Sequence, residues 1–443
     1  MLPRFLARCG APLVCASLLA LPCPEAAGAV GPAESALTPE SAAREALRSN
    51  PDARAARETI GMARGRLVQA GLWPNPELGF VGSDDFAFNA VGERRWGAGL
   101  DQRFPVAGRL GRARDVARVD VALALAELRN FERTLIANAQ RSVLALLALD
   151  RAIAEQTRVT EAARRLAEAS ARRFRVAEVS EAEVTLLEIE RARFEQALRL
   201  LELDRRTETM RLNRLLDRPP EAAVSVAGDL EAALFQPLPP EEATALALRR
   251  RPDLHGLRLE RDRAGAEVRL ARAEAWEDWT VGIDYDVDRQ VFEEEPEFGV
   301  KRDDFLGLAL SVPLPLFDRN PGRIATARAE GRRAVARTES LERAIQMEVN
   351  VGARRVEELR RVAGEYADPI VPRASRNVAL LERGYREGLA GIAEIVQAEQ
   401  QYGVGALRYA RLLGELRQAE VDLEAAAAAS PLLDLAFAKG IRP

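Results

Sequence analysis

Residue types that build most metal and catalytic sites are scarce in this chain of 443 residues. The sequence has one histidine, His255, and four methionines. It therefore excludes a histidine-cluster zinc site and a methionine ladder for copper, and it argues against a histidine-dependent catalytic triad. The three cysteines, Cys9, Cys15 and Cys23, all lie in the first 23 residues. A disulfide framework, a cysteine metal site and a catalytic thiol are thus excluded from the rest of the chain.

An excess of either charge is also missing, because 64 basic residues nearly balance 68 acidic ones and leave a formal net charge of −4. Only two of the basic residues are lysines. A slightly acidic chain of this kind is a poor binder of polyanions, so we expect no nucleic acid partner.

The first 29 residues have the order of a secretory signal peptide. Arg4 and Arg8 precede an apolar run over residues 11–21, and the small residues 27–29 (AGA) form a candidate cleavage site. The apolar run is too short to span a bilayer as a helix. Cys23 offers a second possibility, lipid attachment, although Pro22 stands where a small residue is normally required. We predict a signal peptide over residues 1–29 and export to an oxidising compartment.

The rest of the chain repeats itself with a period near 200 residues. Residues 47–52 (LRSNPD) match residues 248–253 (LRRRPD), and Trp73 matches Trp276. The offset grows along the chain, which indicates small insertions in the second half. We divide the chain into a first repeat over 30–230, a second repeat over 231–430 and a tail over 431–443.

Both repeats have the same predicted order: a short helix, a second helix, two alternating segments and a long helical hairpin. Prolines mark the helix starts and breaks, since the residue before proline resists the helical conformation. Asp52 and Asp253 follow two of these prolines, and we interpret each as a helix cap or dipole partner. The predicted elements are short helices at 38–49 and 240–250, second helices at 52–72 and 253–275, strands at about 76–104 and 279–314, and hairpins at 108–216 and 321–428.

The alternating segments have the length of membrane-crossing strands, about 9–11 residues each. The clearest are residues 281–287 and 306–314, where apolar residues alternate with small or acidic ones. All four tryptophans, Trp73, Trp96, Trp276 and Trp279, lie at the edges of these segments, which is typical of an interfacial aromatic girdle. The alternative is an amphipathic hairpin with tryptophan in a soluble core. The acidic cluster at 293–295 and Glu297 is interpreted as a solvated loop between strands.

Four strands cannot close a barrel, and open edges in hydrocarbon would leave backbone groups unpaired. If the strands cross a membrane, several chains must share one barrel. Two chains would supply eight strands and three chains would supply twelve.

The hairpins contain helices of exceptional length. Residues 108–176 have no proline and no glycine after Gly111, which predicts a helix of about 100 Å. Residues 322–383 are comparable, with Pro369 and Pro372 expected to kink the helix. Such helices must form a coiled coil or a helical barrel, and most of their arginines and glutamates are expected to form a solvated face.

In this order of elements, and over essentially the whole chain after the signal peptide, the sequence resembles the TolC-like outer membrane efflux proteins. Residues 174–180 (FRVAEVS) and 385–391 (YREGLAG) resemble the tips of that family's two coiled-coil hairpins. Residues 314–322 (LPLFDRNPG) resemble the strand-to-helix turn of its heavy-metal branch, the cobalt-zinc-cadmium type.

The resemblance implies a mainly α-helical homotrimer with a twelve-strand barrel in outer membrane lipid and a long helical tunnel in the periplasm. It also implies a passive channel, without cofactor, that docks on a periplasmic adaptor and an inner-membrane pump of the resistance-nodulation-division class. Heavy-metal cations are the expected cargo.

The resemblance further assigns roles to residues at the tips. Glu394 and Gln397 fall on the positions of the acidic ring around the periplasmic aperture, and Glu183 has the related place in the first hairpin. Three copies of Glu394 would attract cations and repel one another. The alternative is that Glu394 is an exposed glutamate on a helix surface, without a role at the aperture. The expected adaptor-docking tips include Ala177, Val179, Ser180, Gly388 and Gly391, with both glycines permitting the tight reversal.

Three other readings remain open on the sequence alone. A multidrug or type I secretion channel would have the same fold with different cargo. A periplasmic coiled-coil adaptor should show one hairpin flanked by soluble β domains, which the two hairpins and tryptophan-edged strands disfavour. For an enzyme, the sequence offers no constellation of catalytic residues.

Overall fold

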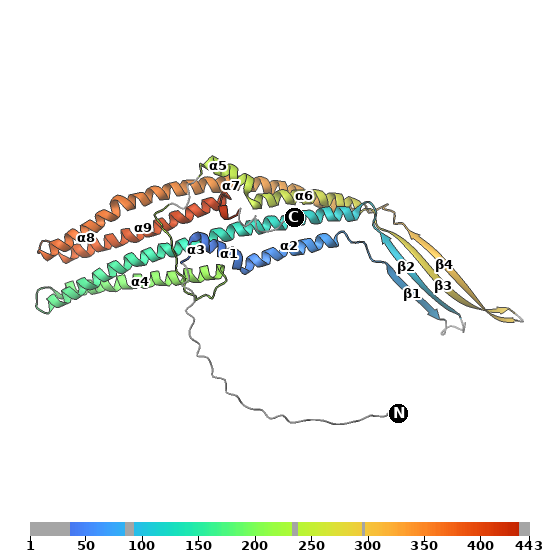
Figure 1. Cartoon of the computed structure of the whole chain (residues 1–443), viewed down its shortest axis with the longest axis horizontal. Helices are drawn as coiled ribbons and strands as arrows, with labels where there is room; N and C mark the ends of the chain where they lie inside the picture. Colours follow the sequence, from blue (N-terminus) through green and yellow to red (C-terminus); the bar gives the residue numbers. More distant parts are fainter. Residues whose placement is uncertain (1–35, 85–92, 233–237, 295–296, 434–443) are drawn as a thin grey trace, which may run out of the picture.

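The computed structural model describes residues 36–84, 93–232, 238–294 and 297–433. These residues form an elongated molecule in which helices occupy most of the length and a four-stranded sheet projects from one end (Figure 1). The predicted signal peptide, Cys23, Glu295 and residues 434–443 of the predicted tail lie outside the described residues.

The order of elements is the same in both halves, as the sequence predicts. The first half contains α1 (Pro39–Ser49), α2 (Pro51–Gln69), β1 (Glu77–Asp84), β2 (Arg94–Phe104), α3 (Arg109–Phe174) and α4 (Glu181–Leu215). The second contains α5 (Pro240–Arg250), α6 (Pro252–Ala273), β3 (Trp279–Glu294), β4 (Glu297–Ser311), α7 (Pro321–Glu365), α8 (Val371–Arg386) and α9 (Ile392–Ala426). The mainly α-helical fold with a duplicated helix-helix-strand-strand-helix-helix unit is thus confirmed.

The short helices of the first half, α1 and α2, begin where side chains satisfy free backbone amides. Thr38 accepts a hydrogen bond from the amide of Ser41 at 3.1 Å, and Asn50 accepts one from the amide of Ala53 at 3.0 Å. Pro51 and Pro252 occupy the first turns of α2 and α6, where a missing N–H leaves no carbonyl without a partner. The break between α1 and α2 thus has both a side-chain cap and a proline, whereas the break between α5 and α6 has the proline alone.

The two hairpins match in length but differ in continuity. Helix α3 runs unbroken for 66 residues, about 100 Å at 1.5 Å per residue. The corresponding stretch of the second half is interrupted at Tyr366–Ile370, where Asp368 leaves the helical conformation (φ −153°, ψ 120°) next to Pro369. This confirms the predicted kink at Pro369. Pro372 makes no kink, because it lies in the first turn of α8, where proline is tolerated.

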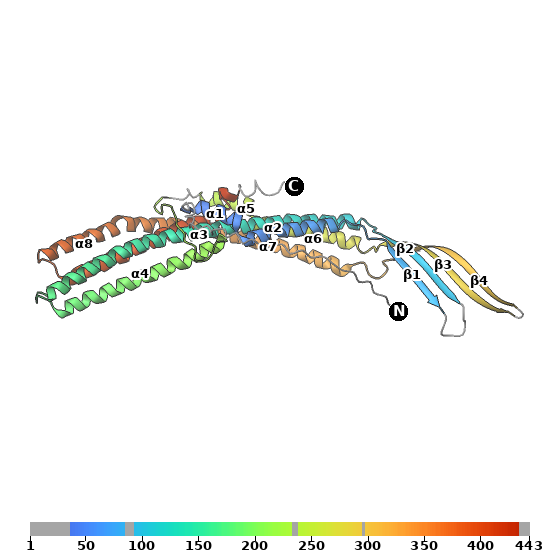
Figure 2. The same cartoon turned by 60° about the horizontal axis from the view of Figure 1, so that its bottom comes forward.

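Helix α3 is the centre of the packing and contacts α1, α2, α4, α6 and α9. Its buried positions are largely alanine and leucine, which allow neighbouring helices to approach closely. Figures 1 and 2 show the α3–α4 and α8–α9 tips together at the end opposite the sheet. The molecule thus has a hairpin-tip end, a helical middle and a sheet end.

The sheet is antiparallel with the order β1-β2-β3-β4. Strands β3 and β4 have 16 and 15 residues, longer than the expected 9–11, because their ladder continues to the pair Glu294 and Glu297. Hydrophobic alternation stops before the ladder does. Glu293, Glu294 and Glu297 are therefore strand residues, and the predicted solvated loop is corrected on this point. Leu314 lies beyond β4, between two prolines that cannot donate to a ladder.

Candidate functional site

The first hairpin tip reverses through a left-handed residue. The amide of Glu178 donates to the carbonyl of Arg173 at 3.0 Å, and the amide of Ala177 donates to that of Phe174 at 2.9 Å. Ala177 has φ +60°, an unusual conformation for a residue with a Cβ. Ser180 then caps α4, since its hydroxyl accepts a hydrogen bond from the amide of Glu183 at 3.2 Å.

The second tip repeats this geometry 211 residues later. Leu389 donates to the carbonyl of Gly384 at 2.7 Å, and Gly388 has φ +76°. The conformation of Gly388 favours glycine, as expected. Gly391 has φ −85° and ψ 156°, an extended conformation open to any residue, so its predicted role in the reversal is not supported.

The two predicted gate carboxylates occupy equivalent positions. Glu183 and Glu394 are each the third residue of their helix, where the positive end of the helix dipole favours a carboxylate. The carboxylate of Glu394 accepts a hydrogen bond from the amide of Gly391 at 3.2 Å. Glu394 and Gln397 are exposed, and Glu183 is half-buried.

A polar contact that the sequence analysis missed joins the two tips. Arg173 donates a hydrogen bond to the Tyr385 hydroxyl at 2.6 Å, and that hydroxyl lies 3.5 Å from a carboxylate oxygen of Glu183. Arg173 also pairs with Glu178 at 3.1 Å. We call Arg173, Tyr385 and Glu183 the tip latch. Tyr385 is one of only five tyrosines and opens the YREGLAG motif, which was the available signal.

Around the latch the tips expose apolar side chains. Phe174 is 44% exposed, Val176 66% and Leu389 80%, while Val179 is half-buried. Exposed apolar groups on a turn are available for contact with a partner.

A buried carboxyl lies farther along α9 and was also missed. Burial and the charge of Glu382 raise the pKa of Glu399, against the opposing charges of Arg158 and Arg165. Nearby, Tyr402 donates a hydrogen bond to Glu155 of α3 at 2.7 Å. This part of α9 therefore contacts α3 through ionisable groups. No sequence pattern around Glu399 distinguished it from the other glutamates of α9.

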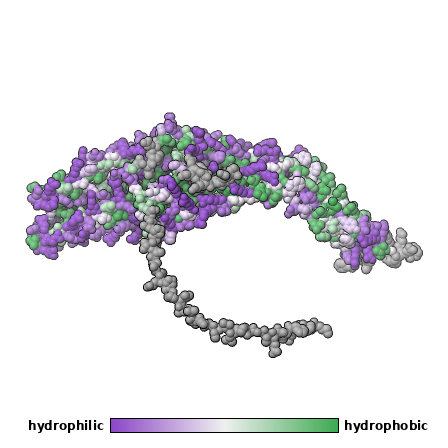
Figure 3. Space-filling view, in the orientation of Figure 1, coloured by the Kyte–Doolittle hydropathy of each residue, from purple (hydrophilic) through white to green (hydrophobic). Residues whose placement is uncertain are grey.

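One face of the sheet is apolar over four strands. The register places Leu78, Phe80, Ala98, Leu100, Ile283, Tyr285, Leu306 and Leu308 on it in two cross-strand rows. Leu306 and Leu308 are each 79% exposed, and Figure 3 shows hydrophobic side chains gathered over the sheet next to the helices, giving way to polar ones farther out. This face has no covering element among the described residues.

The tryptophans flank this face at two levels. Trp73 and Trp276 precede β1 and β3, and Trp279 begins β3 at the helical end. Trp96 lies toward the other end of the sheet, opposite Val287, and stands 6.1 Å from the ring of Tyr285. All four are roughly half exposed, with values between 44% and 59%.

The opposite face of the sheet is polar and acidic. Arg95 pairs with Asp286 at 3.2 Å, but among the described residues no cation pairs with Asp101, Asp284 or Asp288. Glycine makes room for these carboxylates: a Cβ on Gly97, Gly282 or Gly307 would overlap an oxygen of Asp286, Asp101 or Asp284, respectively. A water-filled space over this face would be lined by negative charge.

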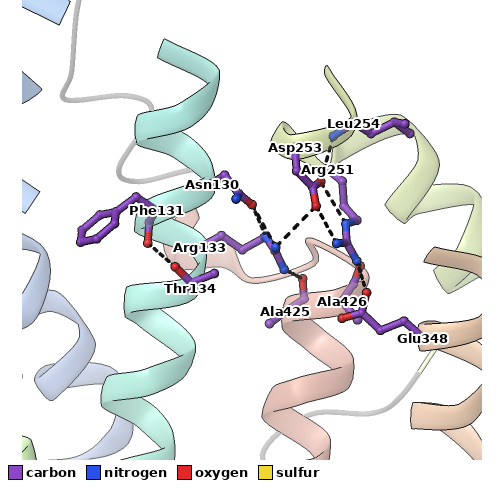
Figure 4. A network of polar contacts seen from close by, with 10 residues as sticks. All are labelled: Asn130, Phe131, Arg133, Thr134, Arg251, Asp253, Leu254, Glu348, Ala425 and Ala426. Carbon is purple, nitrogen blue, oxygen red and sulfur yellow. Dashed lines mark hydrogen bonds and ion pairs between the residues drawn. The ribbon is translucent and has the colours of Figure 1, made fainter. Parts of the chain in front are cut away.

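A charged network holds the far end of α9 in the middle of the molecule (Figure 4). Arg251 pairs with Asp253 at 2.7 Å and with Glu348 at 2.5 Å, and Arg133 lies 3.9 Å from the same Asp253 carboxylate. Arg133 also donates to the carbonyl of Ala425 at 2.9 Å. Burial alone would raise the pKa of Asp253, but the hydrogen bonds and charge of Arg251, with the charge of Arg133, hold it below its ordinary value. We call these residues the central network.

The first half replaces this network with neutral groups. Asn50 donates to the carbonyl of Leu215 at the end of α4, at 3.0 Å, and Asp52 is exposed. Asp52 and Asp253 were expected to have the same capping role. The structure shows that only Asp253 is bound into an ion-pair network.

Within the described ranges, no group of three or more histidine, cysteine, aspartate or glutamate side chains is arranged to hold a metal ion. None of the helices in the described part of the chain is both long enough and apolar enough to cross a membrane.

Comparison with known proteins fits this architecture. Residues 244–429 match the family described as outer membrane efflux protein. The CusC channel superposes with a TM-score of 0.72 at 14% identity, covering 88% of this chain and 92% of that one. The CmeC outer membrane channel of Campylobacter jejuni gives a TM-score of 0.70 at 14% identity, covering 89% of this chain and 88% of that one.

The second half of the chain thus matches the outer membrane efflux protein family, and the fold of the described chain is that of these outer membrane channels. Both solved structures are membrane channels. A curated relative is the cobalt-zinc-cadmium resistance protein CzcC of Cupriavidus metallidurans. It is 25% identical over 402 residues, which are 88% of this chain and 89% of the relative.

Proposed function

We propose that three copies of this chain form the outer membrane duct of a tripartite efflux system, through which cargo moves passively from an adaptor and a pump of the resistance-nodulation-division class to the exterior. The sheet carries this proposal. It has one exposed apolar face, and its edge strands β1 and β4 each lack a second strand partner in the described chain. Closing a twelve-strand barrel would pair those edges and give the apolar face to lipid.

The spacing of the tryptophans supports this placement in a membrane. Trp96 lies opposite Val287 of β3, which is eight residues beyond Trp279 on the same strand. The two levels of tryptophan are therefore about 26 Å apart along the strand. At the usual barrel tilt this is roughly 20 Å across the membrane, near the height of a barrel's apolar band. We assign Trp73, Trp276 and Trp279 to the periplasmic interface and Trp96 to the outer interface.

Heavy-metal cations are the proposed cargo. The relative named for cobalt, zinc and cadmium resistance supports this assignment. The polar face of the sheet would line the exit, and three copies of Asp101, Asp284 and Asp288 would lower the energy of a cation there.

At the other end, we assign the periplasmic gate to Glu394, Gln397 and Glu183, and the adaptor contact to the exposed tips. The two tips have the same backbone geometry. A partner that recognises the backbone of the turn in one tip can therefore also bind the other tip. Ala177, Val179, Ser180 and Gly388 lie on this surface. Gly391 lies there too, as the N-cap of α9.

The test is deletion of the gene followed by growth on graded zinc, cobalt, cadmium and copper beside a panel of dyes and antibiotics. Sensitivity to metals alone, restored by the wild-type gene, is the expected result. Sensitivity to drugs alone would retain the channel and replace the cargo. Recovery of the protein from the soluble fraction rather than from outer membranes would overturn the channel itself.

A further inference from the structure

Three arginines lie side by side on the apolar face, at its outer border. Arg94 of β2 pairs in register with Arg289 of β3, which pairs with Arg302 of β4. Directly opposite residues of an antiparallel sheet point to the same side. The row therefore shares its face with Trp96 and Tyr285, two and four positions closer to the helices on their strands.

The position of this row matches the level of lipid headgroups. Arg289 lies ten residues beyond Trp279 on β3, about 33 Å along the strand and roughly 25 Å across the membrane at the usual tilt. The apolar band of a membrane barrel has about that height. The arginines thus stand where the hydrocarbon of the outer leaflet ends, on the side that faces lipid.

The charges of this row are only partly compensated. Asp84 pairs with Arg94 at 3.0 Å, and Asp304 pairs with Arg302 at 3.1 Å. Arg289 is exposed and lies between the other two arginines, without an ion-pair partner among the described residues. Like charges directly opposite one another destabilise a sheet, so an anion between them would be favourable.

We propose that Arg94, Arg289 and Arg302 bind the phosphate of a phosphorylated lipid in the outer leaflet. Arginine suits this role because its planar guanidinium binds phosphate oxygens in pairs. On the same face the apolar rows begin four positions closer to the helices, beyond the row of Trp96, Val287 and Asp304, and provide a surface for the acyl chains of the same molecule. This inference rests on the proposed membrane insertion of the strands.

The test is a lipid titration of the purified trimer by native mass spectrometry. The probes are lipid A with its phosphates, the same glycolipid without phosphate, and inorganic phosphate. We expect preferential binding of the phosphorylated lipid, weakened about fivefold by Arg289→Gln, the effect of one basic charge near a membrane surface. Lys301→Gln is the matched control, because Lys301 is adjacent to Arg302 in β4 but lies on the opposite face, paired with Asp303 at 3.1 Å.

Three results would overturn the inference: equal binding of the two glycolipids, an equal loss in Lys301→Gln, or binding of inorganic phosphate with no preference for lipid. Outer membrane fractionation of each variant separates this outcome from failure of the proposed function. Variants that insert as trimers but show no phosphate preference reject only the arginine row. A wild-type chain absent from outer membranes rejects both.

Discussion

Replacing Asp253 with asparagine should destabilise the central network strongly. The substitution preserves shape but removes the negative charge between two guanidiniums, and Arg251 is only 5% exposed in its side chain. Glu348 cannot replace that charge well, because its own side chain is 50% exposed to water.

The magnitude follows from the burial of the pair. Removing one partner of a buried ion pair costs about 3–5 kcal/mol. Asp253 retains 21% exposure, which argues for a smaller value of about 2–4 kcal/mol. Thermal unfolding followed by circular dichroism should show a lower midpoint. Asp52→Asn at the equivalent position of the first half is the control, with an expected change within about 0.5 kcal/mol.

The same substitution should change the pH dependence of stability. Because the pKa of Asp253 is lowered in the folded state, its stabilising effect is complete above the unfolded value near 3.8 and is lost as the pH falls through the folded value. The difference in stability between wild type and Asp253→Asn should therefore shrink in acid. A difference that is constant from pH 6 to pH 2, or Asp253→Asn as stable as Asp52→Asn, would refute this account of the network.

Further predictions concern the tips. Tyr385→Phe removes the hydroxyl of the tip latch and should raise the open probability in planar bilayers. Tyr366→Phe, whose hydroxyl has no hydrogen bond within the described residues, should not. Gly388→Val strains a residue at φ +76° by about 1–3 kcal/mol and should abolish crosslinking to the adaptor with trimers intact, whereas Gly391→Ala should crosslink normally. Glu394→Ala should weaken block of the channel by divalent cations, and unchanged conductance and block would remove Glu394 from the gate.

Much of the fold could be predicted because it depends on local signals. Proline positions defined the short helices, and the absence of proline and glycine over residues 108–176 predicted α3 closely. The ends of β3 and β4 were wrong because the ladder continues where alternation has stopped. Hydrophobic alternation marks the extent of the apolar face, whereas strand length is set by the hydrogen-bonded ladder.

The site was harder to predict because it depends on contacts between residues far apart in the sequence. The family resemblance indicated both tips and the pair Glu183 and Glu394, which the structure places at equivalent helix positions. The tip latch joins Arg173 to a tyrosine 212 residues away, and no periodicity predicts which side chains meet at that distance. The different fates of Asp52 and Asp253 likewise depend on Arg133, which α3 brings from elsewhere in the chain.

Helix α9 is held at one end by the central network and carries Glu394 at the other. Its 35 residues make it a lever arm of about 52 Å. A tilt of about 5° at the network would move the tip by roughly 4–5 Å, about one helix radius with side chains. Small changes of angle in the middle of the molecule are therefore amplified at its hairpin-tip end.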